Sequence, residues 1–228
     1  MTNSIRMLST LGLMGAMRSL SAAFEAASGL RVDADFAPTL ALLKRLRSGE
    51  AADLVILTRE GLDEIIGEGR VIADGAADLA RSYVGIAVRA GQTHPDIASE
   101  AALRATLLAA RSVAYSRLGA SGVYFAQLIA RMGIAEQINA RATIVEQGFT
   151  AERLVSGEAD LAVQQISELK QVDGIEVVGP VPYELQTPAV FSAGRIATTG
   201  NAEAAERLLR YLASPEVVPV LRRSGLEP

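Results

Sequence analysis

Apolar positions along this chain alternate between a helical and an extended spacing. In residues 14–28 the apolar side chains recur every three or four positions, which predicts a helix that ends at Gly29. Residues 31–37 alternate apolar and polar positions, which predicts a strand. Residues 53–57 form a continuous apolar run, as expected for a strand that is covered on both faces.

The same spacing predicts regular elements along the rest of the chain. The expected strands cover residues 5–9, 31–37, 53–57, 80–88, 112–115, 142–145, 160–163, 175–178 and 188–198. The expected helices cover residues 14–28, 39–47, 60–68, 103–110, 121–132, 150–156, 202–212 and 216–223. Strands and helices alternate through the first 70 residues, so we predict an α/β fold with mainly parallel sheets flanked by helices.

The chain contains no internal repeat, low-complexity run or long linker. Any domain boundary must therefore lie in short crossings, and we predict two of them, near residues 81–84 and 180–188. One lobe would comprise residues 1–82 and 186–228, and residues 83–185 would form a second, inserted lobe. Two crossings make a hinge, which suits a protein that closes on a ligand.

Composition excludes several classes of function. The 228 residues are 50% hydrophobic, enough for a large core, and the net charge of −4 argues against nucleic-acid binding. The absence of cysteine excludes disulfides, thiolate catalysis and zinc–thiolate sites. No apolar run reaches the roughly 18 residues of a membrane span, so we expect no membrane insertion. The chain opens without a signal-peptide pattern. We expect a periplasmic protein if a signal was removed, and a cytoplasmic one if the chain is native as given.

Small polar residues and glycines follow the carboxyl ends of the predicted strands and precede helices. Ligands of open α/β sheets bind beyond this edge, where helix starts offer free N–H groups and a positive dipole end. The candidate ligand-binding residues are Ser9, Thr10, Gly12, Thr39, Ser116, Arg117, Ala120, Ser121, Gly122, Gln147, Gln164 and Gln165. Hydroxyl and backbone donors of this kind suit a small anion, either a dehydrated oxyanion or a carboxylate.

Each candidate also has a plain structural interpretation. Serine and threonine are common helix N-caps, so Thr39, Thr58 and Ser121 also fit simple capping. The glycines of residues 119–122 fit a tight strand-to-helix turn, and Gln164 with Gln165 fits a solvated turn. Arg117 fits either a carboxylate fork or solvent exposure.

No catalytic or metal-binding cluster is recognisable in the sequence. His94 is the single histidine, beside Pro95 in a polar stretch, and we expect it on a surface loop. No Ser/His/Asp triad can be built around it, and no group of acids has metal-ligand spacing. We therefore predict no catalytic residue, no metal and no cofactor.

Four motifs, in this order, resemble the substrate-binding proteins of molybdate-type ABC importers. They are Ala23–Gly29 (AFEAASG), Gly49–Leu54 (GEAADL), Val155–Asp160 (VSGEAD) and Leu212–Glu216 (LASPE). The resemblance spans nearly the whole chain and implies the two-lobed type II periplasmic-binding-protein fold with the ligand between the lobes. It also implies a solute-binding protein that captures a small anion for an ABC permease, and we expect a monomer.

The resemblance carries over to several candidate positions. Thr39 falls on the family's second-loop serine, and residues 120–122 fall near its middle loop. The family's first-loop serine falls near Gly12, and Ser9 and Thr10, slightly earlier in the chain, could substitute for it. The family's late tyrosine has no counterpart, because the corresponding strand end reads Gln164-Gln165. This departure leaves open whether the anion is molybdate or an organic carboxylate.

Two other functions stay open. The sequence also resembles a molybdate-binding-protein-like branch that includes an aconitate isomerase, an enzyme class that moves a proton and a double bond in a tricarboxylate. Arg117, Gln147, Gln164 and Gln165 could hold such a substrate, but no general base is visible in the sequence. The third hypothesis is a cytoplasmic anion sensor, which would need an exposed apolar patch for its partner.

Overall fold

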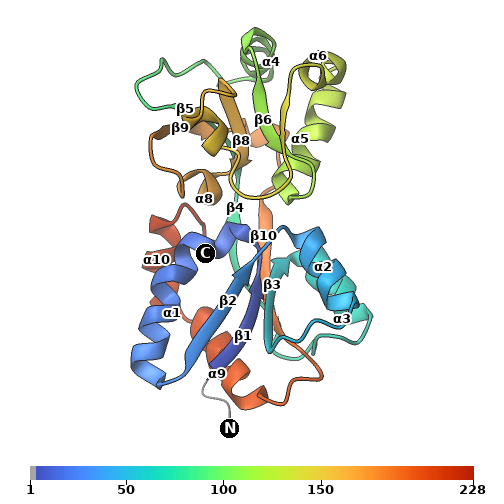
Figure 1. Ribbon diagram of the computed structural model, residues 1–228, viewed down its shortest axis with the longest axis vertical. Coiled ribbons are helices and arrows are strands. Elements are labelled where there is room, and N and C mark those ends of the chain that lie inside the picture. Colours follow the sequence, from blue (N-terminus) through green and yellow to red (C-terminus); the bar gives the residue numbers. More distant parts are fainter. Residues whose placement is uncertain (1–3) are drawn as a thin grey trace. The chain divides into compact units, whose positions relative to one another are not determined.

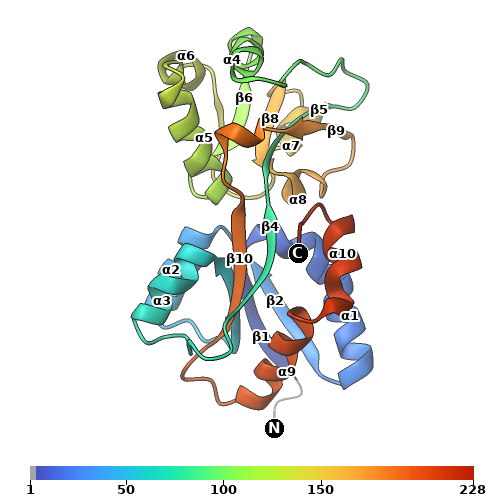
Figure 2. The same ribbon diagram turned by 180° about the vertical axis from the view of Figure 1, so that it is seen from behind.

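A computed structural model of the protein describes residues 4–228 (Figures 1 and 2). Contacts within the chain divide it into two compact units. The first unit runs to Ser82 and resumes at Ala189–Pro228, and the second unit is Tyr83–Pro188. Each unit has its own sheet and its own apolar cores, so the two are described in turn.

The first unit is built on a five-stranded sheet with the order β2-β1-β3-β10-β4. Its strands are β1 (Ser4–Ser9), β2 (Arg31–Phe36), β3 (Leu54–Thr58), β4 (Ala77–Ser82) and β10 (Ala189–Arg195). Strand β1 is parallel to both β2 and β3, with Met7 beside Ala34 and Leu54. Strand β10 is antiparallel to both of its neighbours, β3 and β4 (Figure 2). The first three strands therefore end at the same edge of the sheet.

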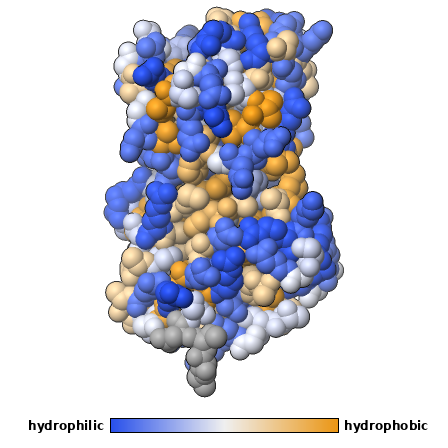
Figure 3. Space-filling view, viewed as in Figure 1, coloured by the Kyte–Doolittle hydropathy of each residue, from blue (hydrophilic) through white to orange (hydrophobic). Residues whose placement is uncertain are grey.

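Helices cover both faces of this sheet (Figure 1). One face packs against α1 (Met14–Ser28), α9 (Ala202–Leu212) and α10 (Val218–Arg223), with short turns η1 (Leu11–Leu13) and η3 (Pro215–Val217) before α1 and α10. The other face packs against α2 (Thr39–Arg47) and α3 (Arg59–Gly67). The outer side of α2 and α3 is hydrophilic (Figure 3), and ion pairs of Arg47 with Glu64 and Glu68 lie there.

The second unit repeats this arrangement with the order β7-β6-β8-β5-β9. Its strands are β5 (Val84–Arg89), β6 (Val113–Ser116), β7 (Thr143–Val145), β8 (Leu161–Gln165) and β9 (Ile175–Pro180). Its helices are α4 (Glu100–Ala109), α5 (Ala120–Arg131), α6 (Ala135–Asn139), α7 (Glu152–Val155) and α8 (Ile166–Leu169), with the turn η2 (Tyr183–Leu185). Strand β6 is parallel to β7 and β8, while β5 is antiparallel to β8 and β9.

The repeated topology confirms the predicted type II periplasmic-binding-protein fold. The sheets, expected to be mainly parallel, are mixed, because two neighbouring pairs in each are parallel and two are antiparallel. In each sheet the strand that enters from the other unit, β10 or β5, is antiparallel and occupies the fourth position. Parallel neighbours need crossover helices, and these helices cover the two faces of each sheet.

Local sequence explains the elements that were predicted most closely. Helix α1 has the bounds expected from its apolar spacing, and it ends at Gly29 with a φ of 72°, a conformation that glycine adopts without steric cost. Every residue of β3 is buried, as expected from its continuous apolar run.

Three sequence predictions are corrected by the structure. The single strand expected over residues 80–88 is two strands, β4 and β5, because the chain passes from one sheet to the other at Tyr83. The short helices α6 and α8 were missed, since neither spans enough turns to produce an apolar period. Strand β8 extends through Gln164 and Gln165, whereas we had expected the strand to end at residue 163.

The second crossing lies slightly later than expected. Residues 186–188 belong to the second unit and not to the first. The reason is the Gln186 side chain, which accepts a hydrogen bond from the Val84 N–H at 2.8 Å and donates to the Val181 carbonyl at 2.5 Å. Tyr83 and Tyr183, next to the two crossings, also stack edge to face with centroids 4.9 Å apart. We retain the hinge function of the crossings as a prediction.

Among residues 4–228, no helix is both long enough and apolar enough to cross a membrane.

Candidate functional site

In the first unit, three strand ends and three helix starts meet at one edge of the sheet. The Thr10 N–H donates to the Ile56 carbonyl at 2.9 Å, and the Ala37 N–H donates to the Ser9 carbonyl at 3.1 Å, which ties the ends of β1, β2 and β3 together. The chain then enters η1 and α1, α2 or α3. Helix starts leave backbone N–H groups without helical partners, so this edge presents several donors.

Thr39 is the most informative residue of this edge. It is 6% exposed, and its hydroxyl finds no hydrogen-bond partner anywhere in the described chain. Thr39 is the first residue of α2, and Pro38 occupies the capping position, so the simple capping interpretation does not apply. A buried hydroxyl without a partner is costly, and a ligand oxygen would satisfy it.

Thr58, in contrast, is a helix cap. It precedes α3, and its hydroxyl accepts a hydrogen bond from the Gly61 N–H at 3.4 Å. The two threonines therefore occupy similar places at adjacent strand ends but have different roles. Of these two threonines, Thr39 is the one whose hydroxyl has no partner within the described chain.

The other candidates of the first unit are buried at the end of β1. Ser9 is 0% and Thr10 is 5% exposed, and the Ser9 hydroxyl donates to the Thr10 carbonyl at 3.1 Å. Gly12 does not provide the room for a ligand that we expected. A Cβ at this position would lie 2.5 Å from Cζ of Phe191, so glycine is required there by the packing of a core ring.

In the second unit, the loop between β6 and α5 brings five candidates together: Ser116, Arg117, Ala120, Ser121 and Gly122. Helix α5 begins at Ala120 with Gly119 as its cap, and Ser121 is 3% exposed at the second helical position. Ser121 is therefore not a cap either. The Ser116 hydroxyl accepts a hydrogen bond from the Leu118 N–H at 3.2 Å, and Arg117 is exposed.

Gly122 is explained by the turn. A Cβ at this position would lie 1.5 Å from the Ser116 carbonyl oxygen, so no other residue fits while the turn keeps its shape. Gly122 is therefore explained by the tight strand-to-helix turn and not by contact with a ligand. The turn places the start of α5 directly over the end of β6, which is how Ser116 and Ser121 share one edge of the sheet.

Gln164 was predicted to bind the ligand, but its side chain is buried, at 3% exposure, and forms hydrogen bonds within the protein. Its side-chain oxygen accepts hydrogen bonds from both the N–H (2.8 Å) and the hydroxyl (3.1 Å) of Thr150. Its side-chain nitrogen donates to the Gly148 carbonyl at 3.3 Å and to the Glu168 carboxyl. A carboxamide has two donors and two acceptor sites, and all are occupied. Gln164 therefore holds the β7–α7 loop, and its amide is not available to a ligand.

The other two glutamines differ from each other in exposure. Gln165 is 2% exposed and is the last residue of β8. Gln147 is exposed on the β7–α7 loop, directly before Gly148, so the loop held by Gln164 carries it.

Glu168 is a buried carboxyl at the same edge of the second sheet. It is 7% exposed, and burial raises its pKa to about 7 despite hydrogen bonds from the Gln165 N–H and the Gln164 side chain. The sequence offered no candidate general base, and the structure supplies one in Glu168. Gln165 caps α8 and Glu168 is its third helical residue, so Glu168 reaches back to the cap N–H as in a capping box. The spacing Gln-x-x-Glu at residues 165–168 was the sequence signal for it.

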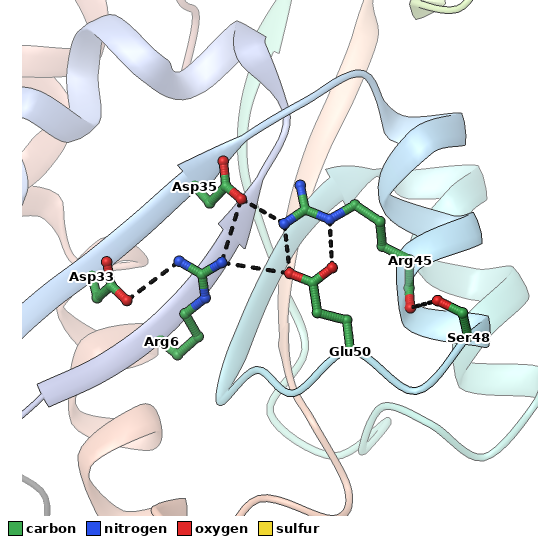
Figure 4. Close-up of polar contacts among 6 residues, drawn as sticks. All are labelled: Arg6, Asp33, Asp35, Arg45, Ser48 and Glu50. Carbon is green, nitrogen blue, oxygen red and sulfur yellow. Dashed lines mark hydrogen bonds and ion pairs between the residues drawn. The ribbon is translucent and has the colours of Figure 1, made fainter.

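The densest charge cluster lies elsewhere in the first unit (Figure 4). Arg45 donates to Glu50 at 2.6 Å and to Asp35 at 2.5 Å, and Arg6 donates to Asp35 at 3.3 Å. These hydrogen bonds hold the pKa values of Asp35 and Glu50 below their usual range, with Arg45 as the main cause. The cluster links Arg6 on β1, Asp35 on β2 and Arg45 on α2 to Glu50, which precedes β3. Its opposite charges pair with each other, which gives it a structural role.

Residues 4–228 contain no group of three or more His, Cys, Asp or Glu side chains able to hold a metal ion. His94 lies on the surface, as expected, where its Nε2 is 2.8 Å from Glu176. His94 pairs with Glu176 and is not among the candidate residues at the two sheet edges.

Comparison with known proteins agrees with this architecture. The family model described as bacterial extracellular solute-binding protein matches residues 5–227. The chain belongs to this solute-binding family. Its fold is also that of the Azotobacter vinelandii periplasmic molybdate-binding protein, with a TM-score of 0.83 at 16% identity over 98% of this chain and 99% of that one. A sulfate-binding protein of Mycobacterium tuberculosis gives a TM-score of 0.73 at 16% identity, covering 99% and 86% of the two chains.

One relative of this chain is an enzyme by name. The aconitate isomerase of a Pseudomonas species is 36% identical over 99% of this chain and 88% of that protein. The identity to this enzyme is more than twice the 16% identity to the molybdate-binding protein.

Proposed function

We propose that this solute-binding-family protein binds a small anion, either an oxyanion or a small organic carboxylate, and delivers it to an ABC permease. The observation that carries the proposal is the buried, unpartnered hydroxyl of Thr39 at the start of α2. That hydroxyl and the adjacent helix N–H groups are uncharged donors, which bind a dehydrated anion well.

The proposed ligand-binding residues are Thr10 and Thr39 in the first unit and Ser121, Arg117 and Gln147 in the second. Arg117 is exposed and supplies a positive charge. Wrong anions would be rejected mainly because they leave buried donors without partners. We propose that the protein acts as a monomer.

A panel of ligands tests the proposal by thermal denaturation: molybdate, tungstate, sulfate, phosphate, and di- and tricarboxylates including both aconitate isomers. A ligand at 100 times its Kd adds about 2.7 kcal/mol of stability. We expect one chemical class to raise the Tm of the wild type and to raise that of Thr39→Val much less. The absence of any shift across the panel would overturn the proposal.

The second candidate is an isomerase of a small unsaturated tricarboxylate. It is favoured by the 36% identity to an aconitate isomerase over nearly the whole chain. A proton NMR time course with cis-aconitate distinguishes the two functions, because a binding protein leaves the ligand unchanged and an isomerase converts it.

A further inference from the structure

Glu168 is placed at the edge of the second sheet by two neighbours. As the third residue of α8, its carboxyl turns back toward the helix start and accepts a hydrogen bond from the Gln165 N–H. The side chain of Gln164 donates a second hydrogen bond. Gln164 and Gln165 are the last two residues of β8, so the carboxyl lies at the carboxyl end of that strand. This is the edge at which α/β sheets bind ligands.

The orientation of Glu168 is determined by the surroundings of Gln164. Both hydrogen bonds from Thr150 to the Gln164 oxygen force the Gln164 nitrogen toward Gly148 and Glu168. A carboxylate has about four acceptor sites, and these two donors occupy only part of them. Glu168 therefore keeps acceptor capacity that Gln164 has lost.

The protonation state of Glu168 is not set by neighbouring charged groups. Strands β5, β8 and β9 pack against α8. Their charged residues are Arg89, the last residue of β5, and Glu176 on β9, which pairs with His94. The causes of the raised pKa are burial and then the two hydrogen bonds, and neither these residues nor Lys170 at the end of α8 is among them.

We propose that Glu168 is the proton-transfer residue for an allylic isomerisation of a small unsaturated polycarboxylate. This inference rests on the isomerase alternative of the proposed function. The Glu168 carboxylate removes a proton from a CH₂ carbon beside the double bond, and the C–H electron pair becomes the new double bond. The electron pair of the old double bond moves to the far carbon, which takes the proton back from the Glu168 carboxyl. One C–H bond breaks and one forms, so no co-reactant is needed.

The acidity of Glu168 fits this role. A group with a pKa of about 7 is populated in both forms at neutral pH, which a residue that takes and returns a proton requires. The competing interpretation is that Glu168 only caps α8. The two interpretations differ in what happens to turnover when the carboxyl is replaced by an amide.

The experiment compares wild type, Glu168→Gln and Glu136→Gln in a cis-aconitate isomerisation assay followed by NMR, together with substrate-induced Tm shifts. Glutamine keeps an acceptor oxygen for the cap, and Glu136 is an exposed residue of α6 that serves as the matched control. We expect E168Q to keep the substrate-induced Tm shift and to lose about 100-fold or more in kcat. E136Q should equal the wild type.

The possible outcomes test the isomerase function and the role of Glu168 separately. If the wild type does not isomerise the substrate, the isomerase function and the Glu168 inference both fall. If the wild type isomerises it and E168Q does so equally fast, only the Glu168 inference falls. Where E168Q does not fold, the wild-type kcat against pH decides. An inflection near pH 7 supports the inference, and a flat profile from pH 5.5 to 8.5 overturns it.

Discussion

The side-chain oxygen of Gln164 accepts two hydrogen bonds from Thr150, one from its backbone N–H and one from its hydroxyl. Thr150 is 0% exposed, so neither donor has water as an alternative. This pair joins the end of β8 to the loop before α7, and that loop carries Gln147.

Replacing Gln164 with leucine should destabilise the second unit. The change leaves the Thr150 N–H and the Gly148 carbonyl without their Gln164 partner, whereas the Thr150 hydroxyl keeps the Val163 carbonyl at 3.3 Å. Each buried unpaired group costs about 1–3 kcal/mol. Hydrogen exchange of the Thr150 amide measures the effect locally, and we expect its protection to fall by at least about tenfold. Gln92→Leu, at an exposed position, is the control. Unchanged protection at Thr150 would show that the pair is not structurally important.

Replacing Thr39 with valine should weaken ligand binding without destabilising the free protein. The hydroxyl has no partner among the described residues, so its removal costs nothing in the unliganded state. A hydrogen bond to a charged ligand contributes about 1.5–3 kcal/mol, so Kd should rise roughly 10- to 100-fold. Calorimetric titration with the ligand identified by the panel measures this.

Thr58→Val is the matched comparison for the Thr39 variant. It removes a helix cap, so it should lower stability by about 1 kcal/mol. If the Thr39 variant instead lost stability and kept its affinity, the assignment of Thr39 to the ligand would be wrong.

Two glycines of one turn should respond very differently to alanine. A Cβ at Gly122 would meet the Ser116 carbonyl at 1.5 Å, whereas a Cβ at Gly119 has only the Ser121 hydroxyl, at 4.0 Å. We expect Gly122→Ala to lose more than about 3 kcal/mol or to fail to fold, because backbone cannot move aside cheaply. Gly119→Ala should remain close to wild type. Soluble yield and thermal denaturation of the two variants measure the difference.

Glu168 should make the stability of the protein fall as the pH rises. Its pKa is raised by burial from 4.5 to about 7, so between these values the folded protein holds a proton that the unfolded chain has released. Stability is then lost progressively from about pH 4.5 to pH 7, by an order of about 3 kcal/mol in total.

The variant Glu168→Gln lacks this titration. It should therefore gain stability relative to wild type as the pH rises from 5 to 8. Chemical denaturation at several pH values gives the difference, and parallel curves for the two proteins would contradict the raised pKa.

The sequence by itself determined the elements whose signal is local. Helix α1 was predicted with its observed bounds because its apolar period and Gly29 act within one element. The parallel strand pairs of each sheet followed from the alternation of strands and helices. The order of four motifs indicated the family that residues 5–227 match. Thr39 was selected because it follows a strand end, and only the structure showed that Pro38, not Thr39, is the cap of α2.

Tertiary structure decided the features that depend on neighbours far along the chain. A side chain at position 12 would clash with the ring of Phe191, and the Gln164 amide is hydrogen-bonded to Thr150. Both partners are distant in the sequence, so neither interaction could be predicted from the residues around Gly12 or Gln164. The raised pKa of Glu168 arises from burial, which the sequence around a short helix does not reveal. The antiparallel strands β5 and β10 were likewise not predicted, because strand direction is set by hydrogen bonding to partners distant in sequence.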